Sequence, residues 1–419
     1  MSEQSERQER GLMIAARTKL TQKGDVWRVP SQSGFKPFYC VDPVAKTCDC
    51  PDYEKRGERC KHIFAVEFTI ERESNTTTTT DGDTTTTTTT ETLTVTKRTT
   101  YRQDWTAYNT AQTNEKAMFL KLLHELCNCI VEPVQEKGRP RLLYRDMLFA
   151  AAYKVYSTVS SRRFASDLND ARDKGYITKA AHFNSVLRYL DNSALTPVLH
   201  EMIKASSLPL KALETSFAVD SSGFSTCQYV RWFDEKYGKE KSQHQWVKVH
   251  LMTGVKTHIV TSVEVTGGSV NDCPMLPELV EETAKSFTVD EVSADKGYSS
   301  LENHDAIAKV GATPFIAFKS NSTGGVGGLF EKMHHFYQFK RDEFLSHYHQ
   351  RSNVESTFNM VKSKFDSRLR SKGDTAQENE ALCKILCHNL CVLIQSIFEF
   401  GIAATFGAEI TVAPKVAAN

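Results

Sequence analysis

Four residues with metal-binding side chains lie close together in the stretch 48–62, CDCPDYEKRGERCKH. They form two tight pairs, Cys48 with Cys50 and Cys60 with His62. Three thiolates and one imidazole suit tetrahedral zinc, and a closed set of four ligands leaves no open position for catalysis. Chance placement in a chain with eleven cysteines is the alternative, but the paired spacing disfavours it. We therefore expect a structural zinc site.

Three acidic residues stand at positions suited to phosphodiester chemistry. Asp220 ends the strand-like segment FAVD, Asp295 ends VSAD, and Glu355 lies in a segment of helical periodicity that begins near Leu345. Catalysis by two metal ions needs several carboxylates that converge, one ion activating the attacking oxygen and the other the leaving oxygen. A single Asp at a strand end is more often a turn residue or a helix cap. The two aspartates alone therefore do not distinguish a catalytic metal site from ordinary turn or cap positions.

The segment around Glu355 carries further polar residues at helical spacing. Tyr348, Arg351 and Lys362 fall, with Glu355, within roughly 60° of one another on a helix of about 100° per residue. One face would then present a carboxylate between two cations. A surface ion-pair ladder has the same pattern, and so does a surface that holds DNA phosphates beside a metal site.

Basic residues continue beyond this face at four-residue spacing, as Lys364, Arg368 and Lys372. We expect the same helix to carry them as a stripe that contacts the DNA backbone, with a solvated charged face as the alternative. Trp232 and Trp246 could stack on an unpaired base, although tryptophan in a strand usually lies in the core.

Periodicity predicts the elements that position these residues. From Ser216 onward several strand-like segments come first, and strands then alternate with helices, which describes a mixed sheet covered by helices. The last two of the helical segments that precede it are joined at Gly175, which fits either a plain bundle or a DNA-reading helix-turn-helix. The helical segments are 114–131, 141–157, 161–174 and 178–191.

Composition divides the 419 residues into several parts. The tract 74–100 is dominated by threonine and has little to bury, so we expect a linker. Two short strands and an amphipathic helix before it make a small ββα module. The expected parts are a zinc-binding module over 1–73, the linker over 74–100, a helical and possibly DNA-binding domain over 101–215, a catalytic domain over 216–402 and a C-terminal tail over 403–419.

Charge and apolar patterning restrict the location and the partners. The formal net charge is +1, so a nucleic-acid surface must be a local patch. The most apolar stretch, Leu382 to Phe406, is interrupted by polar residues and predicts a buried helix instead of a membrane span. The charged N-terminus has no signal-peptide core, and many cysteines without a secretory signal indicate a reducing compartment. We expect an intracellular protein without a membrane partner.

Residues 12–72 resemble the SWIM zinc finger, including the strands before the cysteines and the tetrapeptide CKHI that opens the helix. The resemblance agrees with zinc held by the four residues named above. SWIM domains bind DNA in some proteins and protein in others, so both kinds of partner remain open.

From about Arg141 to Gly401 the chain is similar to insertion-sequence transposases of the DDE superfamily, in the branch with a Tyr-Arg-Glu-Lys signature. The similarity lies in Tyr-x2-Arg-x3-Glu-x6-Lys, in VDSSG and ADKGY, and in GRPRLLYRDML, SVND and NEALCKILCHNLCVLI. It implies an RNase H-like fold. It also implies that two Mg²⁺ or Mn²⁺ ions are bound by Asp220, Asp295 and Glu355, and that phosphates of the transposon end are held by Tyr348, Arg351 and Lys362.

The same resemblance implies a transposase that cleaves transposon ends and transfers strands into target DNA. Its partners would be double-stranded DNA, as terminal inverted repeats and target, and a second copy of the chain, in a prokaryotic cytoplasm at the nucleoid. A domesticated regulator that binds DNA or protein without strand transfer is the alternative. Hairpin-forming members carry a large all-β insertion before the catalytic Glu, whereas residues 321–354 here are loop and helix in character.

Overall fold

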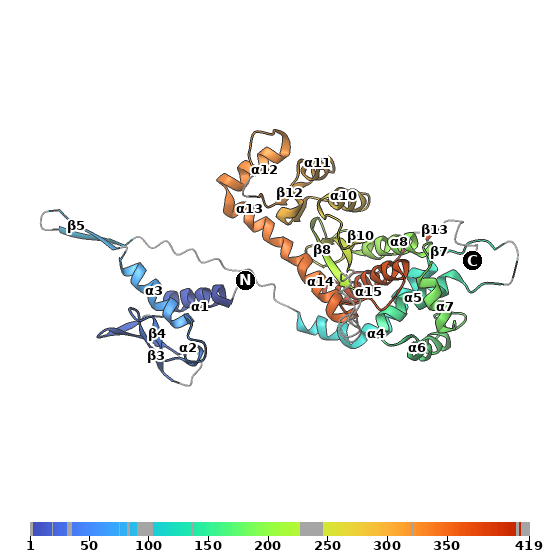
Figure 1. The fold of residues 1–419 in the computed structure, drawn as a ribbon, viewed down its shortest axis with the longest axis horizontal. Helices are drawn as coiled ribbons and strands as arrows, with labels where there is room; N and C mark the ends of the chain where they lie inside the picture. Colours follow the sequence, from blue (N-terminus) through green and yellow to red (C-terminus); the bar gives the residue numbers. More distant parts are fainter. Residues whose placement is uncertain are drawn as a thin grey trace, which may run out of the picture. The chain divides into compact units, whose positions relative to one another are not determined.

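A computed structural model describes most of the chain. The described residues are 3–18, 20–31, 36–74, 76–81, 84–89, 104–135, 138, 140–226, 246–319, 322–407 and 410–411. They form two compact units, Met1–Tyr101 and Arg102–Asn419 (Figure 1), and each is described by itself. Trp232 and the strand-like segment 229–236 lie outside the described residues.

The first unit is a four-stranded antiparallel sheet with two packed helices. Trp27 and Val29 point to the same side of their strand and are buried, as the alternation of a strand requires. They pack with Ile63 and Val66 of the covering helix. The elements are β1 (Thr21–Lys23), β2 (Val26–Pro30), β3 (Phe38–Asp42), β4 (Thr47–Cys48), helix α3 (Lys61–Ser74), which covers the sheet, and helix α1 (Glu3–Arg17), which packs on α3.

Helix α1 was not predicted, because most of its residues are polar. Gly11 shows how it is held. A Cβ atom at this position would lie 2.5 Å from Cβ of Phe64 and 2.8 Å from the carbonyl oxygen of Lys61. The backbones of α1 and α3 therefore approach too closely for any side chain at Gly11.

The tract predicted to be a linker contains a β-hairpin. Strands β5 (Thr76–Asp81) and β6 (Thr84–Thr89) pair antiparallel, with Thr76 opposite Thr89. Threonine is β-branched and favours extended backbone. The prediction considered what the tract could bury and did not include this preference for strand; the assignment of residues 74–100 as a linker stays a prediction.

The second unit is built on a five-stranded mixed sheet. Strands β8, β9 and β10 run antiparallel, whereas β8, β11 and β12 run parallel. The predicted fold class, an RNase H-like mixed sheet flanked by helices, is confirmed. The order across the sheet is β10 (Val260–Gly267), β9 (Trp246–Gly254), β8 (Ser216–Ser225), β11 (Glu291–Ala294) and β12 (Thr313–Ile316).

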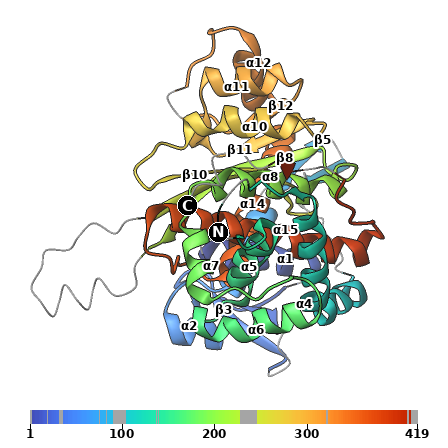
Figure 2. The same cartoon turned by 90° about the vertical axis from the view of Figure 1, so that its right-hand side faces the viewer.

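Helices cover both faces of this sheet, as Figure 2 shows. Phe217 and Val219 of β8 pack in the cluster on one face, while Ala218 and Phe224 belong to the larger cluster on the other. The first face is covered by α10 (Leu276–Ala284) and α11 (Leu301–Lys309), and the second by α8 (Leu195–Ser207), α14 (Ser352–Phe365) and α15 (Asp374–Phe400).

Helix α15 is the central core helix of the second unit. Its polar Asn389 is fully buried and bonds to both backbone groups of Val260, accepting from N at 2.9 Å and donating to O at 2.8 Å. Within the described residues α15 alone is long and apolar enough to cross a membrane, but 78% of its apolar window is buried. The predicted buried helix is confirmed, and it ends at Phe400, before Gly401.

The helical segments before the sheet share its larger core, but one connection differs from the prediction. The third and fourth helices are separated by residues 174–182 instead of a short turn at Gly175. Within this longer connection the N–H of Thr178 donates to Oδ2 of Asp146 at 2.8 Å. The helices are α4 (Trp105–Asn128), α5 (Tyr144–Ser157), α6 (Ser161–Asp173) and α7 (Phe183–Leu190).

The chain between β12 and α14 is loop and helix where it is described, as predicted. Helices α12 (Gly328–Phe339) and α13 (Arg341–Tyr348) pack around the buried Phe344. The prediction of one continuous helix from Leu345 was wrong, because a 3₁₀ turn, η4 (His349–Arg351), separates α13 from α14.

The segment expected to be a C-terminal tail contains a short strand. Strand β13 (Ile410–Thr411) pairs in parallel with β7 (Ile130–Val131), which follows α4. Ile410 is buried in the large core. At least these two residues therefore belong to the second unit.

Candidate active site and zinc site

Asp220 and Asp295 lie beside each other on neighbouring strands. Strands β8 and β11 pair in parallel with Val219 opposite Ala294, so the next residue on each chain is one of the two aspartates. Neighbouring strands are about 4.8 Å apart. The backbone register of the sheet therefore sets the spacing of the two carboxylates.

Asp220 faces the helix that carries Glu355. Side chains alternate along a strand, so Asp220 shares a face with Ala218 and Phe224, which pack in the cluster containing α14 residues. The side chain of Asp220 is 22% exposed, and its Oδ1 accepts a hydrogen bond from the Ser221 N–H at 2.8 Å. The carboxylate is thus held in a fixed direction at the edge of the core.

Arg351 bridges two of the three acidic residues. Its Nη1 lies 3.2 Å from Oδ2 of Asp220, and its Nη2 lies 2.6 Å from Oε1 of Glu355. Burial raises the pKa of Asp220, as do Glu355 and Asp295, while the Ser221 N–H and Arg351 oppose that rise. The three carboxylates therefore interact electrostatically, and one cation contacts two of them at once.

The other two residues of the predicted helix face also reach this edge of the sheet. The hydroxyl of Tyr348 lies 3.5 Å from Oδ1 of Asp295, longer than an ordinary O–H···O bond. Nζ of Lys362 donates to Oγ of Ser222 at 2.6 Å and lies 5.2 Å from the centre of the Phe224 ring. Burial lowers the pKa of Lys362.

The acidic residues suit a divalent cation such as Mg²⁺, which prefers carboxylate oxygens. The Arg351 guanidinium lies between Asp220 and Glu355 and contacts both. A positively charged group therefore fits between these two carboxylates. The three carboxylates do not form a compact ligand cluster in this arrangement. Among the described residues, the single set of potential metal ligands with all its atoms within 4.8 Å is the Cys and His set.

That set is Cys48, Cys50, Cys60 and His62, the predicted zinc ligands, and all four are buried. Nδ1 of His62 lies 3.9 Å from Sγ of Cys48 and 3.9 Å from Sγ of Cys60. A tetrahedron with zinc–sulfur bonds of 2.3 Å has edges of about 3.8 Å. The spacing and the donor atoms therefore fit a tetrahedral zinc ion.

The chain between the two ligand pairs orients one of the thiols. Helix α2 (Pro51–Arg56) starts directly after Cys50, whose Sγ accepts the N–H of Tyr53 at 3.4 Å. Gly57 ends this helix in the left-handed region, with φ 66°. The short helix and its glycine return the chain toward Cys60 and were not predicted.

Comparison with known families finds two matches along the chain. Residues 211–390 match the transposase DDE domain, and residues 33–71 match the SWIM zinc finger. The chain carries a DDE transposase domain and a SWIM zinc finger. The DDE domain supports a transposase function in general. No solved structure matches the chain.

The basic stripe expected beyond the signature of the DDE domain is not on one helix. Helix α14 ends at Phe365, because Asp366 adopts φ 73° and turns the chain. Lys364 pairs with Glu115 of α4, and Nη2 of Arg368 lies 3.1 Å from Oδ2 of Asp366. Both cations thus have acidic partners within the protein, which four-residue spacing alone could not indicate.

Two residues beside the acidic pair of the DDE domain were missed. Tyr298, in turn η3 (Lys296–Tyr298), is 2% exposed, and burial followed by nearby Asp220 and Asp272 raises the pKa of its phenol. Asp272 pairs with Nζ of Lys248 at 3.0 Å. Both residues lie in motifs of the family resemblance, ADKGY and SVND. These motifs were the sequence signal by which the two residues could have been predicted.

Trp246 differs from the usual strand tryptophan. It is 49% exposed at the start of β9 and packs over two glycines, Gly223 and Gly268, where an added Cβ atom would lie 3.1 Å and 3.0 Å from its atoms. The expectation of a core position was wrong, because Gly223 on the neighbouring strand β8 leaves room for the indole at the surface of the sheet.

Proposed function

We propose that this transposase cleaves the ends of a DNA element and joins the freed 3′ ends to target DNA. The observation that carries the proposal is the convergence of Asp220, Asp295 and the η4–α14 segment at one edge of the sheet. Water and then the 3′-hydroxyl would attack phosphodiesters at one site. No covalent protein–DNA intermediate is required.

Asp220, Asp295 and Glu355 would hold two Mg²⁺ or Mn²⁺ ions. Such ions, when bound, activate the attacking oxygen and stabilise the leaving oxygen. The protein supplies fixed positions for two of the ligands, because the parallel register of β8 and β11 sets the distance between the aspartates. Glu355 completes the set from α14.

Arg351, Tyr348 and Lys362 would contact phosphates of the DNA end. Arg351 forms a planar fork that suits a carboxylate or a phosphate equally. It can therefore exchange Asp220 and Glu355 for a phosphate oxygen when DNA binds. Lys362 lies beside Ser222, two residues from Asp220, so its charge is close to the reacting group.

The expected partners follow from the reaction. Strand transfer needs two ends in one event, so we expect at least a dimer on double-stranded DNA, bound at terminal inverted repeats and then at the target. The place of such a reaction is the interior of the cell, at the nucleoid in a prokaryote. Zinc would stabilise the SWIM finger without taking part in catalysis.

The test compares Glu355→Gln with Glu343→Gln on plasmid DNA that carries the element's ends. Glu343 is an exposed acid on α13 that pairs with Lys340, so its variant controls for the loss of one negative charge. We expect Glu355→Gln to bind the ends and to lose Mg²⁺-dependent nicking, while Glu343→Gln cleaves normally. Full cleavage by Glu355→Gln would remove Glu355 from the site. A pre-cut end with a free 3′-hydroxyl then tests strand transfer separately.

A further inference from the structure

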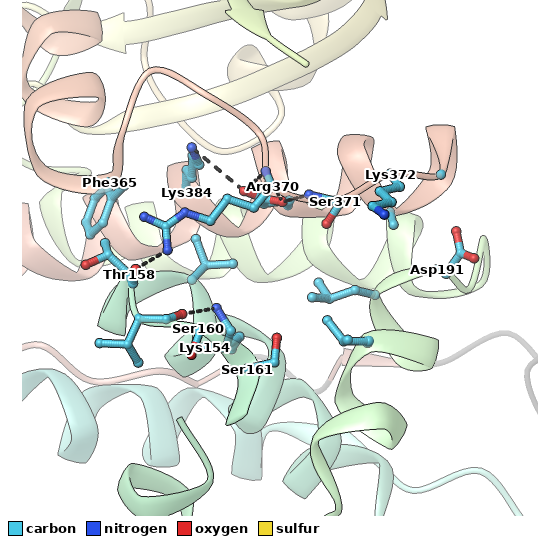
Figure 3. A pocket seen from close by; sticks show the side chains of 17 residues that line it. Lys154, Thr158, Ser160, Ser161, Asp191, Phe365, Arg370, Ser371, Lys372 and Lys384 are labelled. Carbon is cyan, nitrogen blue, oxygen red and sulfur yellow. Dashed lines mark hydrogen bonds and ion pairs between the residues drawn. The ribbon is translucent and has the colours of Figure 1, made fainter. Parts of the chain in front are cut away.

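A cavity of about 480 Å³ lies between the helices that precede the sheet and the segment that follows α14 (Figure 3). Its walls come from Lys154 of α5, the start of α6, and residues 370–373. Phe365, at the end of α14, also lines it, ten residues beyond Glu355. At 1.5 Å per residue the cavity is about 15 Å from the acidic site along that helix.

The charged groups that line the cavity are mainly cationic. Two of the six charged residues in its lining, Glu380 and Lys384, hold the segment 366–371 in place. Glu380 accepts the backbone N–H groups of Arg370 and Ser371 at 3.0 and 2.8 Å, and Lys384 donates to the carbonyl oxygens of Asp366 and Arg368 at 2.7 and 2.6 Å. The six are Lys154, Arg370, Lys372, Lys384, Asp191 and Glu380.

Lys154 is the buried group among the remaining four charges. It is 9% exposed, and among the described residues its Nζ has one hydrogen-bond acceptor, the carbonyl oxygen of Val159 at 2.7 Å. An ammonium group has three N–H donors. Burial lowers the pKa of Lys154, and the positive charge of Arg370 lowers it further, while Glu380 opposes this. A buried cation with unused donors therefore lines the cavity beside a second cation.

Arg370 spans the cavity, as Figure 3 shows, and donates to the carbonyl oxygen of Thr158. Its nearest carboxylate is Oδ2 of Asp366, at 3.7 Å, and Arg368 lies closer to the same oxygen, at 3.1 Å. One carboxylate thus serves two guanidinium groups. The side chain of Arg370 is 48% exposed, and Lys372 is exposed, so the cavity opens to a ligand from solution.

The start of helix α6 adds donors to the same cavity. Ser160 caps this 13-residue helix, and Ser160 and Ser161 both line the cavity. The first N–H groups of a helix have no acceptor within it, and the helix dipole is positive there. A helix N-terminus beside a buried ammonium and a guanidinium is an arrangement that binds phosphate.

We propose that this cavity binds a backbone phosphate of the DNA on which the enzyme acts, away from the cleaved bond. The inference rests on the proposed function and adds a second DNA contact to it. DNA is favoured over a free anion because the cavity opens beside exposed Lys372 and is connected to the acidic site by one rigid helix. Free phosphate or pyrophosphate would use the same groups, so the test includes it.

The experiment measures binding of a short random-sequence duplex at several salt concentrations. The variants are Arg370→Ala and Lys154→Met, and the control is Lys309→Ala, an exposed lysine of α11 that pairs with Glu281. We expect each cavity variant to weaken binding several-fold and to reduce the slope of log K against log salt by about 1. Lys309→Ala should bind like the unmodified protein. Circular dichroism checks the fold, and the half-exposed Arg370 keeps the test valid if Lys154→Met unfolds.

A second arm measures thermal stabilisation by pyrophosphate. Unchanged DNA affinity and slope in folded Arg370→Ala would overturn the proposal. Pyrophosphate stabilisation that Arg370→Ala loses, together with an unchanged DNA slope, would assign the cavity to a free anion and would also overturn it. Failure of the proposed function is a separate result, because an unmodified protein that neither nicks nor joins DNA could still show the expected slopes.

Discussion

The Nη2 atom of Arg351 lies 2.6 Å from Oε1 of Glu355, one helical turn further along the chain. The other arm of the same guanidinium reaches Asp220 at 3.2 Å. The positive charge of Arg351 therefore lies where carboxylates would share a divalent ion. DNA phosphate and the two carboxylates compete for one guanidinium, so we expect binding of DNA and binding of metal to favour each other.

Replacing Arg351 by alanine should strengthen metal binding when DNA is absent, because the competing cation is removed. We expect Mn²⁺ to bind about three- to tenfold more tightly to Arg351→Ala, an effect on the order of 1 kcal/mol. Electron paramagnetic resonance of free Mn²⁺ measures this without any need for activity. Arg368→Ala, which removes an arginine paired with Asp366, is the matched control. Weaker Mn²⁺ binding by Arg351→Ala would contradict the competition.

Lys362 and Lys364 are two residues apart, yet their replacements should have different effects. Lys362 contacts Ser222 and Phe224 at the acidic edge, so Lys362→Met should keep its stability and lose DNA affinity, with a salt slope lower by about 1. Lys364 pairs with Glu115, which also accepts the Tyr156 hydroxyl at 2.8 Å.

Lys364→Met should therefore leave Glu115 without its cation and lower the free energy of unfolding by about 1–3 kcal/mol. Denaturant unfolding and DNA titration on both variants separate the two effects. If both variants lost DNA affinity equally and neither lost stability, the assignment of Lys364 to an internal ion pair would be wrong.

The zinc site predicts opposite results for two cysteines of the first unit. Cys60 is a buried member of the ligand set, whereas Cys40 on β3 lies outside it. Cys60→Ser should lose the bound zinc and make residues 36–74 sensitive to protease, because metal binding supplies much of the folding energy of so small a module. Cys40→Ser should retain one zinc per chain by elemental analysis. Zinc retained by Cys60→Ser would exclude Cys60 as a ligand.

His388 should make the second unit sensitive to acid. Burial lowers the pKa of His388 to about 4, from an ordinary value of 6.5, and its Nε2 contacts the carbonyl oxygen of His258 at 2.9 Å. Between these values the unfolded chain binds a proton that the folded protein does not, so stability falls as the pH falls from 6.5 toward 4. At pH 5 the loss from this residue is about 2 kcal/mol.

His388→Gln keeps a donor for the His258 carbonyl and cannot be protonated. Its free energy of unfolding should therefore change less between pH 7 and pH 5 than that of the unmodified protein, measured by guanidinium titration. His335→Gln, at a half-exposed position on α12, serves as the control. Its free energy of unfolding should fall between pH 7 and pH 5 by as much as that of the unmodified protein. Equal acid sensitivity of His388→Gln and the unmodified protein would contradict the assignment.

The elements around the acidic pair could be predicted because their patterns are local. Asp220 and Asp295 each follow an apolar run that alternates or is fully buried, and parallel pairing then brings the two strand ends together. The face shared by Tyr348, Arg351 and Lys362 was also predictable. All three side chains lie at the acidic edge of the sheet although the 3₁₀ turn η4 interrupts the helix between them.

Other features depend on contacts that a local pattern does not reveal. Helix α1 is polar along most of its length and is positioned by the close approach of Gly11 to α3. The connection before α7 includes a bond from Thr178 to Asp146, which is 32 residues away in the chain. The end of α14 is likewise set by the backbone geometry of Asp366, with φ 73°.

The two aspartates are carried by adjacent strands of one sheet, whereas Glu355 arrives only after the separate helices α12 and α13. Lengthening or replacing the connection between Ile316 and Ser352 would leave the aspartate spacing unchanged. That connection is therefore a point at which another segment could be inserted without changing the strands that carry the two aspartates.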